Sequence, residues 1–441
     1  MRLVVTAILI ILPLLLPAQP QAQPTAIDPV LLQQLQDTIR QQQLQLQQQA
    51  EQIEEQARTL KDLQQQVQAL QHPAAKPVTT TEAPVQQTPT ALVITSGNDK
   101  IKLSLSGQLN RAVNVTSDGE STNVYPVDND ASNSRIRLVG TARITDDLTL
   151  ETRLELAIAP DESSVVSQNN QASGDYFNQR WAEISLTSAT FGKISLGKGD
   201  TASNTTAEVD LSRTDVVQYA GIADISGGMR FREENGNQNL TTLKVSDVFK
   251  SGDGLSRQSR LRYDSPTWNG FRLAGSLVSN QQADAALFWG GEGYGFKAKS
   301  AFAVANTKGA GLFASLPGAR MLYDGSFSGL HTATGLNLTV SGAILERSAR
   351  VDSTNLYVKL GWLTKPTNLG YTAFGVDYTR SRHLALPGDR GYSIGAAVVQ
   401  AFEKIATELY LQYRIYALDR SNSTAPVADI NAGTFGVRVK F

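Results

Sequence analysis

The chain of 441 residues carries 40 basic and 41 acidic side chains, so its formal net charge is -1 and the overall balance suggests no nucleic-acid partner. It contains no cysteine, which excludes disulfides, thiolate metal sites and cysteine nucleophiles. Only three histidines occur, so a histidine-based metal or catalytic cluster is not expected, and the sequence predicts neither a metal nor a cofactor. The length allows several ordinary domains or one large barrel with an appendage.

The first segment, 1–22, has the features of a secretory signal peptide. Arg2 supplies a short positive region, residues 3–16 are almost all apolar, and small and polar residues follow, with cleavage expected after Ala18 or Ala22. The alternative is a membrane anchor, but the apolar run is shorter than the ~20 residues that a spanning helix needs. No other long apolar run exists, so an exported membrane form would have to be a closed β-barrel.

Residues 27–71 are rich in glutamine and carry a seven-residue repeat, which predicts an α-helical coiled coil. One seam is apolar throughout, while the other is apolar at its ends and glutamine in its middle. The two seams are Leu32, Ile39, Leu46, Ile53, Leu60 and Val67, and Leu35, Gln42, Gln49, Gln56, Leu63 and Leu70. Buried glutamine layers fix the oligomeric state, and we expect a trimer; the alternative is a disordered glutamine-rich tract. The Pro- and Thr-rich residues 72–98 predict an extended linker.

From residue 100 onward, apolar and polar residues alternate with a period of two, which also suits a soluble sandwich. The lengths of the links between strands distinguish an outer-membrane barrel from a soluble sandwich. Short links are expected at 146–147, 188–190, 266–270, 332–335, 366–370 and 403–404, and long polar links at 116–133, 160–174, 200–255, 307–319 and 420–430. Alternating short and long links are typical of outer-membrane barrels. The sequence therefore predicts an all-β fold: a transmembrane antiparallel β-barrel of about 16 strands over 100–441, preceded by the coiled coil. Residues 228–234 are assigned to the long segment rather than to a strand that would make the count odd.

Three stretches make 100–441 similar to the Gram-negative trimeric porins. They are FGKISLGKGD at 191–200 running into AEVDL at 207–211, RYDSP at 262–266 with GF at 270–271, and Phe441 after alternating apolar residues. The resemblance implies a water-filled channel for passive diffusion of small hydrophilic solutes and ions. It further implies a homotrimer surrounded by outer-membrane lipid in a Gram-negative bacterium. Phe441 resembles the signal that the barrel-assembly machinery reads.

An even number of strands leaves both ends of the barrel on the periplasmic side, so the predicted coiled coil is expected in the periplasm. This coiled coil departs from the plain general porins and resembles the arm of the DcaP-like porins. This leaves open whether the channel is general or substrate-selective. A third alternative is a structural tether whose coiled coil links the membrane to a periplasmic partner. An enzyme is not predicted, because no G-x-S-x-G motif accompanies the separated histidines.

The resemblance also implies that residues 200–255 fold into the barrel and narrow it. The candidate acids of this constriction loop are Glu208, Asp210, Asp215 and Asp224, and the candidate bases of the wall are Arg135, Arg137, Arg143, Arg260, Arg262 and Arg272. A guanidinium on the lipid face at the bilayer midplane would cost about 2–4 kcal/mol, so these arginines should point inward. Opposed acids and bases would create a transverse field that sorts ions. The alternative is that these charges pair and pin the loop to the wall.

Overall fold

The computed structural model describes residue 40 and residues 94–98, 100–172, 177–234, 238–279, 281–308, 311, 313, 316–421 and 425–441. The chain divides into two units, 1–85 and 86–441, and the description below concerns the second. The predicted signal peptide, the predicted coiled coil and most of the predicted linker lie outside the described residues. The linker was predicted to reach residue 98, whereas Ile94–Gly97 forms a strand.

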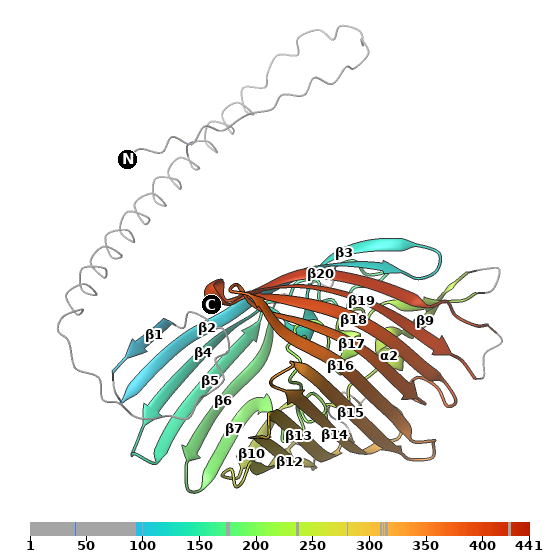
Figure 1. Ribbon diagram of the computed structural model, residues 1–441. Helices are drawn as coiled ribbons and strands as arrows, with labels where there is room; N and C mark the ends of the chain where they lie inside the picture. Colours follow the sequence, from blue (N-terminus) through green and yellow to red (C-terminus); the bar gives the residue numbers. More distant parts are fainter. Residues whose placement is uncertain are drawn as a thin grey trace, which may run out of the picture. The chain divides into compact units, whose positions relative to one another are not determined.

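Sixteen of the described strands form a closed ring in which each pairs antiparallel with its two neighbours (Figure 1). In chain order they are β2 (Ile101–Ser117), β4 (Arg135–Arg143), β5 (Leu148–Ala157), β6 (Asn178–Ser188), β7 (Gly192–Asp200), β10 (Arg257–Asp264), β11 (Phe271–Val278), β12 (Gln282–Gly293), β13 (Phe296–Asn306), β14 (Ala319–His331), β15 (Leu336–Arg347), β16 (Ser353–Thr367), β17 (Gly370–Arg382), β18 (Arg390–Phe402), β19 (Thr407–Asp419) and β20 (Ile430–Lys440). The ring closes where β20 pairs with β2. The prediction of an all-β antiparallel barrel of about 16 strands is therefore confirmed.

The other described elements are short. Two further strands, β1 (Ile94–Gly97) and β3 (Thr122–Asp128), pair with β2. Strands β8 (Arg230–Arg232) and β9 (Leu240–Lys244) form a separate two-stranded sheet, which is why 228–234 adds no strand to the ring. The helical turns are η1 (Asp130–Ser132), η2 (Ile222–Asp224), α2 (Val245–Val248) and η3 (Glu403–Ile405). Within the described residues, no helix is long and apolar enough to cross a membrane.

The strands turn their apolar face outward, the reverse of a soluble protein. In β19, for example, Leu411 and Tyr413 are each 53% exposed, whereas the alternating residues Gln412 and Arg414 are each 1% exposed. Successive side chains of a strand point to opposite faces, so the polar set lines the interior. An apolar outer surface with a polar interior is the pattern of a barrel that stands in lipid.

The connections differ between the two ends of the barrel. At one end, here called the short-turn end, the links are tight, such as those at 144–147, 189–191 and 294–295. At the other, the long-loop end, they include 118–134, 158–177, 201–256 and 420–429. The long-loop end also has brief links at 279–281 and 348–352, so the alternation of lengths is not strict.

Residues 201–256, here called the inner loop, join β7 to β10 and run along the inner face of the wall. Along the loop, successive backbone groups bond to inward side chains of strands that lie progressively further around the ring. These bonds are Ala202 N to Ser276 Oγ (2.6 Å), Leu211 N to Ser328 Oγ (2.9 Å), Gln412 Nε2 to Val217 O (2.7 Å), Tyr416 Oη to Ile222 O (2.7 Å) and Asn114 Nδ2 to Ile225 O (2.5 Å). The loop thus passes β11, β14 and β19 and reaches β2.

The inner loop carries its own apolar contacts. Its buried residues Val216, Val217, Ile222, Ile225, Met229, Phe231 and Phe249 form one cluster with wall tyrosines 357, 371, 410 and 416. The rings of Phe249 and Tyr416 lie 5.7 Å apart. Tyrosine suits this position because its ring packs against the loop, and the hydroxyls of Tyr371, Tyr410 and Tyr416 donate to Glu408, Asn110 and the backbone oxygen of Ile222. The core of the molecule therefore lies inside the barrel, between loop and wall.

Candidate functional site

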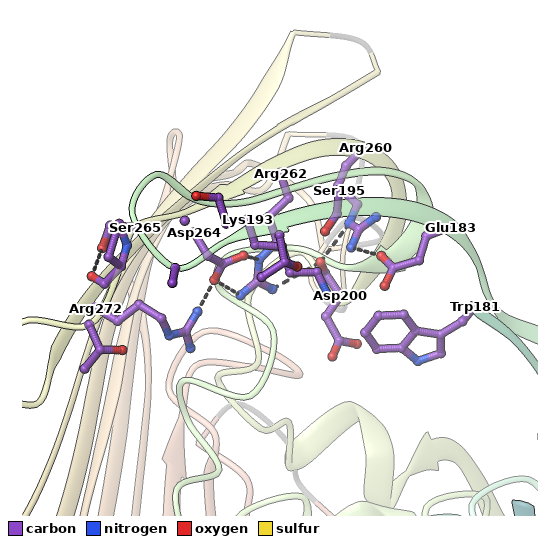
Figure 2. A pocket seen from close by; sticks show the side chains of 16 residues that line it. Trp181, Glu183, Lys193, Ser195, Asp200, Arg260, Arg262, Asp264, Ser265 and Arg272 are labelled. Atoms are coloured by element: carbon purple, nitrogen blue, oxygen red, sulfur yellow. Dashed lines mark hydrogen bonds and ion pairs between the residues drawn. The ribbon is translucent and has the colours of Figure 1, made fainter. Parts of the chain in front are cut away.

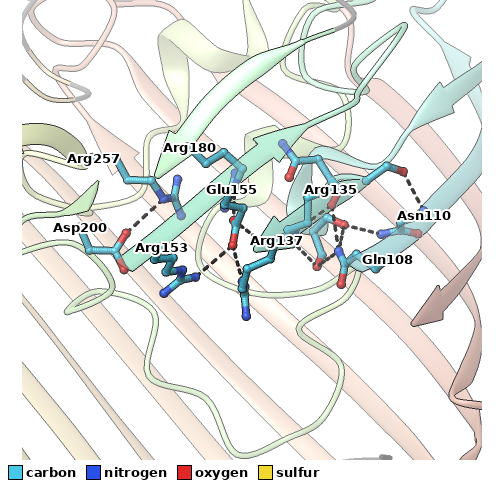
Figure 3. Close-up of polar contacts among 12 residues, drawn as sticks. Gln108, Asn110, Arg135, Arg137, Arg153, Glu155, Arg180, Asp200 and Arg257 are labelled. Carbon is cyan, nitrogen blue, oxygen red and sulfur yellow. Dashed lines mark hydrogen bonds and ion pairs between the residues drawn. The ribbon is translucent and has the colours of Figure 1, made fainter. Parts of the chain in front are cut away.

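A single carboxylate on the inner wall is surrounded by four arginines (Figure 3). Glu155 of β5 lies opposite Arg137 of β4 in the strand register. Its carboxylate contacts Arg137 Nε at 2.6 Å, Arg180 Nε at 2.8 Å, Arg153 Nη2 at 3.0 Å and Arg135 Nη1 at 3.7 Å. Strands β4, β5 and β6 each supply at least one of these arginines. We call these five residues the Glu155 cluster.

The Glu155 cluster is not electrically balanced. Four guanidiniums against one carboxylate leave three positive charges. The Glu155 side chain is 0% exposed, whereas that of Arg137 is 37% exposed, so the cationic groups are the ones that reach the lumen. The guanidinium of Arg153 also stacks on the ring of Trp181, 3.6 Å from its centroid, which holds it in place.

Acids of the inner loop face part of this cluster across a polar cavity of about 210 Å³. Its basic lining residues are Arg135, Arg180 and Arg257, and its acidic lining residues are Asp130, Glu208, Asp224 and Asp253. Arg257 is additionally ion-paired with Asp200 at 3.1 Å. The cavity therefore has a basic side made by the wall and an acidic side made by the inner loop and η1.

Burial changes the protonation of the loop acids. It raises the pKa of Asp253 to about 7. Burial also raises the pKa of Glu208 well above its usual range, and the nearby Asp253 carboxyl adds to this effect. For Asp224, burial and then the Asp130 carboxyl raise the pKa, although Tyr219 donates a hydrogen bond to Asp224. Carboxyls with raised pKa values hold their protons more readily than exposed ones. The average negative charge on the acidic side of the cavity is therefore reduced, while the basic side keeps its charge.

The four predicted acids lie in three different surroundings. Glu208 and Asp224 line the polar cavity just described. Asp215 lines a second cavity of about 320 Å³ together with Arg135, Arg137, Arg438, Lys440 and Phe441. Asp210 instead forms an ion pair with the fully buried Lys359 of β16, so at this residue the pinning alternative describes the geometry. Lys359 also donates to Thr214 Oγ1 and Gln218 O, both at 2.9 Å.

The predicted basic residues also lie in different surroundings. Arg135 and Arg137 belong to the Glu155 cluster, whereas Arg143 is exposed at the short-turn end of β4. Arg260 is buried and paired with Glu183 at 2.6 Å. Arg262 and Arg272 both contact Asp264, around a cavity of about 440 Å³ (Figure 2).

Arg260 and Arg262 hold the start of the inner loop. Arg260 Nε donates to Asp200 O at 2.8 Å, and Arg262 Nη1 donates to Thr201 O at 2.7 Å. Residue 200 ends β7 and residue 201 begins the loop. These two arginines therefore fix the point at which the chain leaves the wall, so at these residues the pinning alternative describes the geometry, through bonds to backbone carbonyls.

Several residues of the polar cavity and the Glu155 cluster were not among the predicted site residues: Arg153, Glu155, Arg180, Arg257, Asp130 and Asp253. A signal existed for two of them, because Arg153 and Glu155 alternate with leucines in the sequence and so lie on the polar face of their strand. Arg180 lies where the β5–β6 register shifts, which alternation does not reveal. Within the described part of the chain, no group of side chains is suited to hold a metal ion.

Phe441 lies at the seam of the ring. Its backbone N–H donates to Gly107 O at 3.0 Å, and Gly107 N donates back to Phe441 O at 2.7 Å. A Cβ added to Gly107 would stand 2.7 Å from the Phe441 ring, so this glycine leaves the space that the ring occupies. The aromatic ring thus packs onto β2 beside the point of closure.

A family model described as Gram-negative porin matches residues 88–439. The chain belongs to the Gram-negative porin family. It is thus an outer-membrane channel for passive diffusion. No curated protein sequence matches this porin.

Solved structures show the same fold at low sequence identity. An anion-selective porin from Comamonas acidovorans has 14% identity and a TM-score of 0.53, covering 78% of this chain and 100% of that one. Salmonella typhi OmpF, in complex with daunomycin, has 15% identity and a TM-score of 0.51, covering 79% and 100%. The trimer form of Vibrio cholerae OmpT, an outer-membrane protein, has 13% identity and a TM-score of 0.50, covering 78% and 100%.

Proposed function

We propose that the inner loop and the Glu155 cluster together form the constriction of this porin, and that the constriction favours anions. The loop supplies Glu208, Asp224 and Asp253, and the wall supplies the arginines. Small hydrophilic solutes and ions pass between the two sides. The observation that carries the proposal is the excess of three positive charges around the buried Glu155.

The physical argument concerns fixed charge in a narrow polar space. Rings of basic side chains lower the energy of an anion and raise that of a cation at the same place. The interaction is strong where water is scarce, because the effective dielectric constant is lower than in bulk water. The loop acids oppose this field, but the raised pKa values of Glu208, Asp224 and Asp253 reduce their average negative charge.

The second cavity supports the same preference. Of its charged lining residues, Arg135, Arg137, Arg438 and Lys440 are basic and Asp215 is acidic. Glu408 offsets part of this charge, since it pairs with Arg438 at 2.5 Å and with Lys440 at 3.4 Å. The relative from Comamonas acidovorans is described as anion-selective, which is compatible with the proposal.

The reversal potential tests the preference directly. The purified porin is inserted into a planar bilayer with potassium chloride at unequal concentrations on the two sides. We expect the zero-current potential to lie toward the Nernst potential of chloride. A potential toward that of potassium would contradict anion preference, and a blocked or absent current would contradict the constriction as a pathway.

The assembly proposals rest on other observations. The heptad repeat in 27–71 and the trimer form of the related OmpT support a homotrimer with a periplasmic coiled coil behind a cleaved signal peptide at 1–22. Cross-linking of the purified protein should give trimers. If the chain were mainly a tether to a periplasmic partner, a protein lacking 27–71 would conduct like the full chain but lose the partner. We further propose that Phe441 serves as the signal for the barrel-assembly machinery.

A further inference from the structure

The polar cavity of about 210 Å³ carries opposite charges on its two sides, with three guanidiniums on the wall side and four carboxyls on the other. An anion held by the guanidiniums faces the carboxyls, and a cation held by the carboxyls faces the guanidiniums. Each therefore meets like charge across the cavity, which is costly where charges lie close together. A molecule that carries both charges meets attraction on both sides.

Arg180 supplies free hydrogen-bond donors on the basic side. Its Nε donates to Glu155 Oε1 at 2.8 Å (Figure 3), and no described residue accepts a hydrogen bond from its two terminal nitrogens. Arg257 Nε likewise has no hydrogen-bond partner among the described residues, although it forms an ion pair with Asp200. A guanidinium edge presents two parallel N–H donors, which fit the two oxygens of a carboxylate. The basic side is thus suited to a carboxylate group.

Glu208 supplies free acceptors on the opposite side. Its backbone N–H donates to Thr205 O, whereas no described residue forms a hydrogen bond or an ion pair with its carboxylate. Asp253 accepts a bond from Thr205 N at Oδ1 alone, and Asp130 accepts one from Ser164 Oγ at 2.6 Å. An ammonium group has three donors and no acceptor, so oxygens with unused lone pairs are the partners that it needs.

The raised pKa values of the loop acids agree with a missing cation. Burial raises the pKa of Glu208 and Asp224, and it raises that of Asp253 to about 7. A positive charge held nearby has the opposite effect, because it favours the ionised carboxylate. One ionised carboxylate among the four is sufficient for one ammonium, so the remaining acids can keep their protons.

The volume of the cavity limits the size of the molecule. At ~30 Å³ for each water molecule in the liquid, the cavity has the volume of about seven waters. An α-amino acid as small as alanine fits this space. Its ammonium and carboxylate are attached to one carbon atom, so both charges can lie inside the same cavity.

We propose that the polar cavity binds a small zwitterion of the α-amino acid class, with its carboxylate on Arg180 and its ammonium among the carboxyls of the opposite side. This inference rests on the proposed constriction and adds a class of solute to it. Inorganic ions respond there to the net charge of the lining groups, whereas an amino acid is oriented by the two opposed sides. Amino acids therefore cross this porin by a saturable route.

Four compounds of nearly equal size and shape separate the two charges. Alanine carries both; in lactate a hydroxyl replaces the ammonium, in alaninamide a carboxamide replaces the carboxylate, and lactamide has both replacements. Each is added at pH 7 to planar bilayers that contain many copies of the full-length porin, and the reduction of the potassium chloride current is measured.

We expect the half-saturating concentration of alanine to be about tenfold lower than that of each other compound, which corresponds to ~1.4 kcal/mol. Equal effects of the four compounds, or a stronger effect of any compound than of alanine, would overturn the inference. This comparison uses the unaltered chain and does not depend on the folding of a variant.

Two variants address the two sides of the cavity. Arg180→Gln should reduce the effect of alanine to that of alaninamide, because the carboxylate loses its partner. Glu208→Gln with Asp253→Asn should reduce it toward that of lactate, because ammonium loses two of its four possible partners. The amides keep the shape of the acids, and an asparagine oxygen can still accept from Thr205 N. If alanine kept its advantage in both variants, the site would lie elsewhere and the inference would be wrong.

Asp146→Asn is the matched control, since Asp146 is an exposed carboxylate at the short-turn end. It should leave the effect of alanine unchanged. The reversal potential of the same bilayers keeps this inference separate from the proposed ion preference. A chloride-directed potential without an alanine effect would remove the amino-acid site alone. An alanine effect with a potassium-directed potential would support the site and contradict the anion preference alone.

Discussion

Two parts of the inner wall differ in how far their basic and acidic side chains balance one another. Where the inner loop covers β16 to β19, two buried bases are each matched by one acid: Lys359 by Asp210, and Arg414 by Asp377, whose guanidinium and carboxylate make two bonds of 2.7 and 2.6 Å. On β4 to β6, four arginines share Glu155. Paired buried charges satisfy one another and hold the structure, whereas surplus charge is left to act on what passes through the lumen. Charge balance, more than charge itself, separates structural from functional side chains here.

The largest expected effect follows from removing part of the inner loop. A variant lacking residues 204–226 loses Glu208, Asp224 and most of the apolar contacts with the wall tyrosines. Single-channel conductance should rise several-fold, and larger sugars should enter liposomes faster, because the loop no longer occupies the lumen.

A control for this deletion removes the exposed residues Arg350 and Val351 from the link between β15 and β16. Conductance should then stay as it was. If the 204–226 deletion folds and assembles but conducts like the intact chain, the loop is not the constriction.

Breaking a balanced pair should damage stability and leave selectivity alone. In Asp210→Asn, Lys359 keeps its bonds to Thr214 and Gln218 but loses its counter-charge while fully buried. An uncompensated buried charge costs about 3–5 kcal/mol, and the two remaining hydrogen bonds place the expected loss at the lower end. Urea unfolding in lipid vesicles measures the change. A stable variant with a shifted reversal potential would reverse our assignment of this pair.

Reducing the surplus charge should do the opposite. Arg135→Ala with Arg137→Ala removes two of the three excess positive charges of the Glu155 cluster and leaves Glu155 paired with Arg153 and Arg180. Cation preference should increase in reversal-potential measurements, because the barrier for cations falls. Thermal stability should change less than in Asp210→Asn. Arg143→Ala serves as the control, since Arg143 is exposed at the end of β4.

The smallest expected effect is a dependence of selectivity on pH. Burial raises the pKa of Asp253 to about 7, so this carboxyl is charged above that pH and neutral below it. Acidification removes negative charge from the loop while the arginines stay charged, and anion preference should therefore grow as the pH falls through 7. Asp253→Asn should abolish most of this response. A preference that weakens on acidification would show that other groups control the field.

Sequence patterns predicted the fold because alternation and link length are local properties. The number of strands follows from counting the alternating segments between links. A closed ring then requires the last strand to pair with the first. Site residues could be predicted only where alternation within a single strand places them on one face. This pattern placed Arg135 and Arg137 together, and it also places Arg153 and Glu155 on the polar face of their strand. The partner of Asp210 is 149 residues away and that of Arg260 is 77 residues away. Such pairings depend on which strands become neighbours and in what register, and no local pattern carries that information.

The seam between β20 and β2 joins Lys440 to Gln108, two residues that are far apart along the chain. Contacts of such long sequence separation form late and slowly, because most of the intervening chain must be ordered before they can be made. Until then β2 and its growing sheet present unpaired edges, which are templates for pairing with other chains. An unfinished barrel is consequently the aggregation-prone state of this protein, and closing the seam is the step that ends the risk.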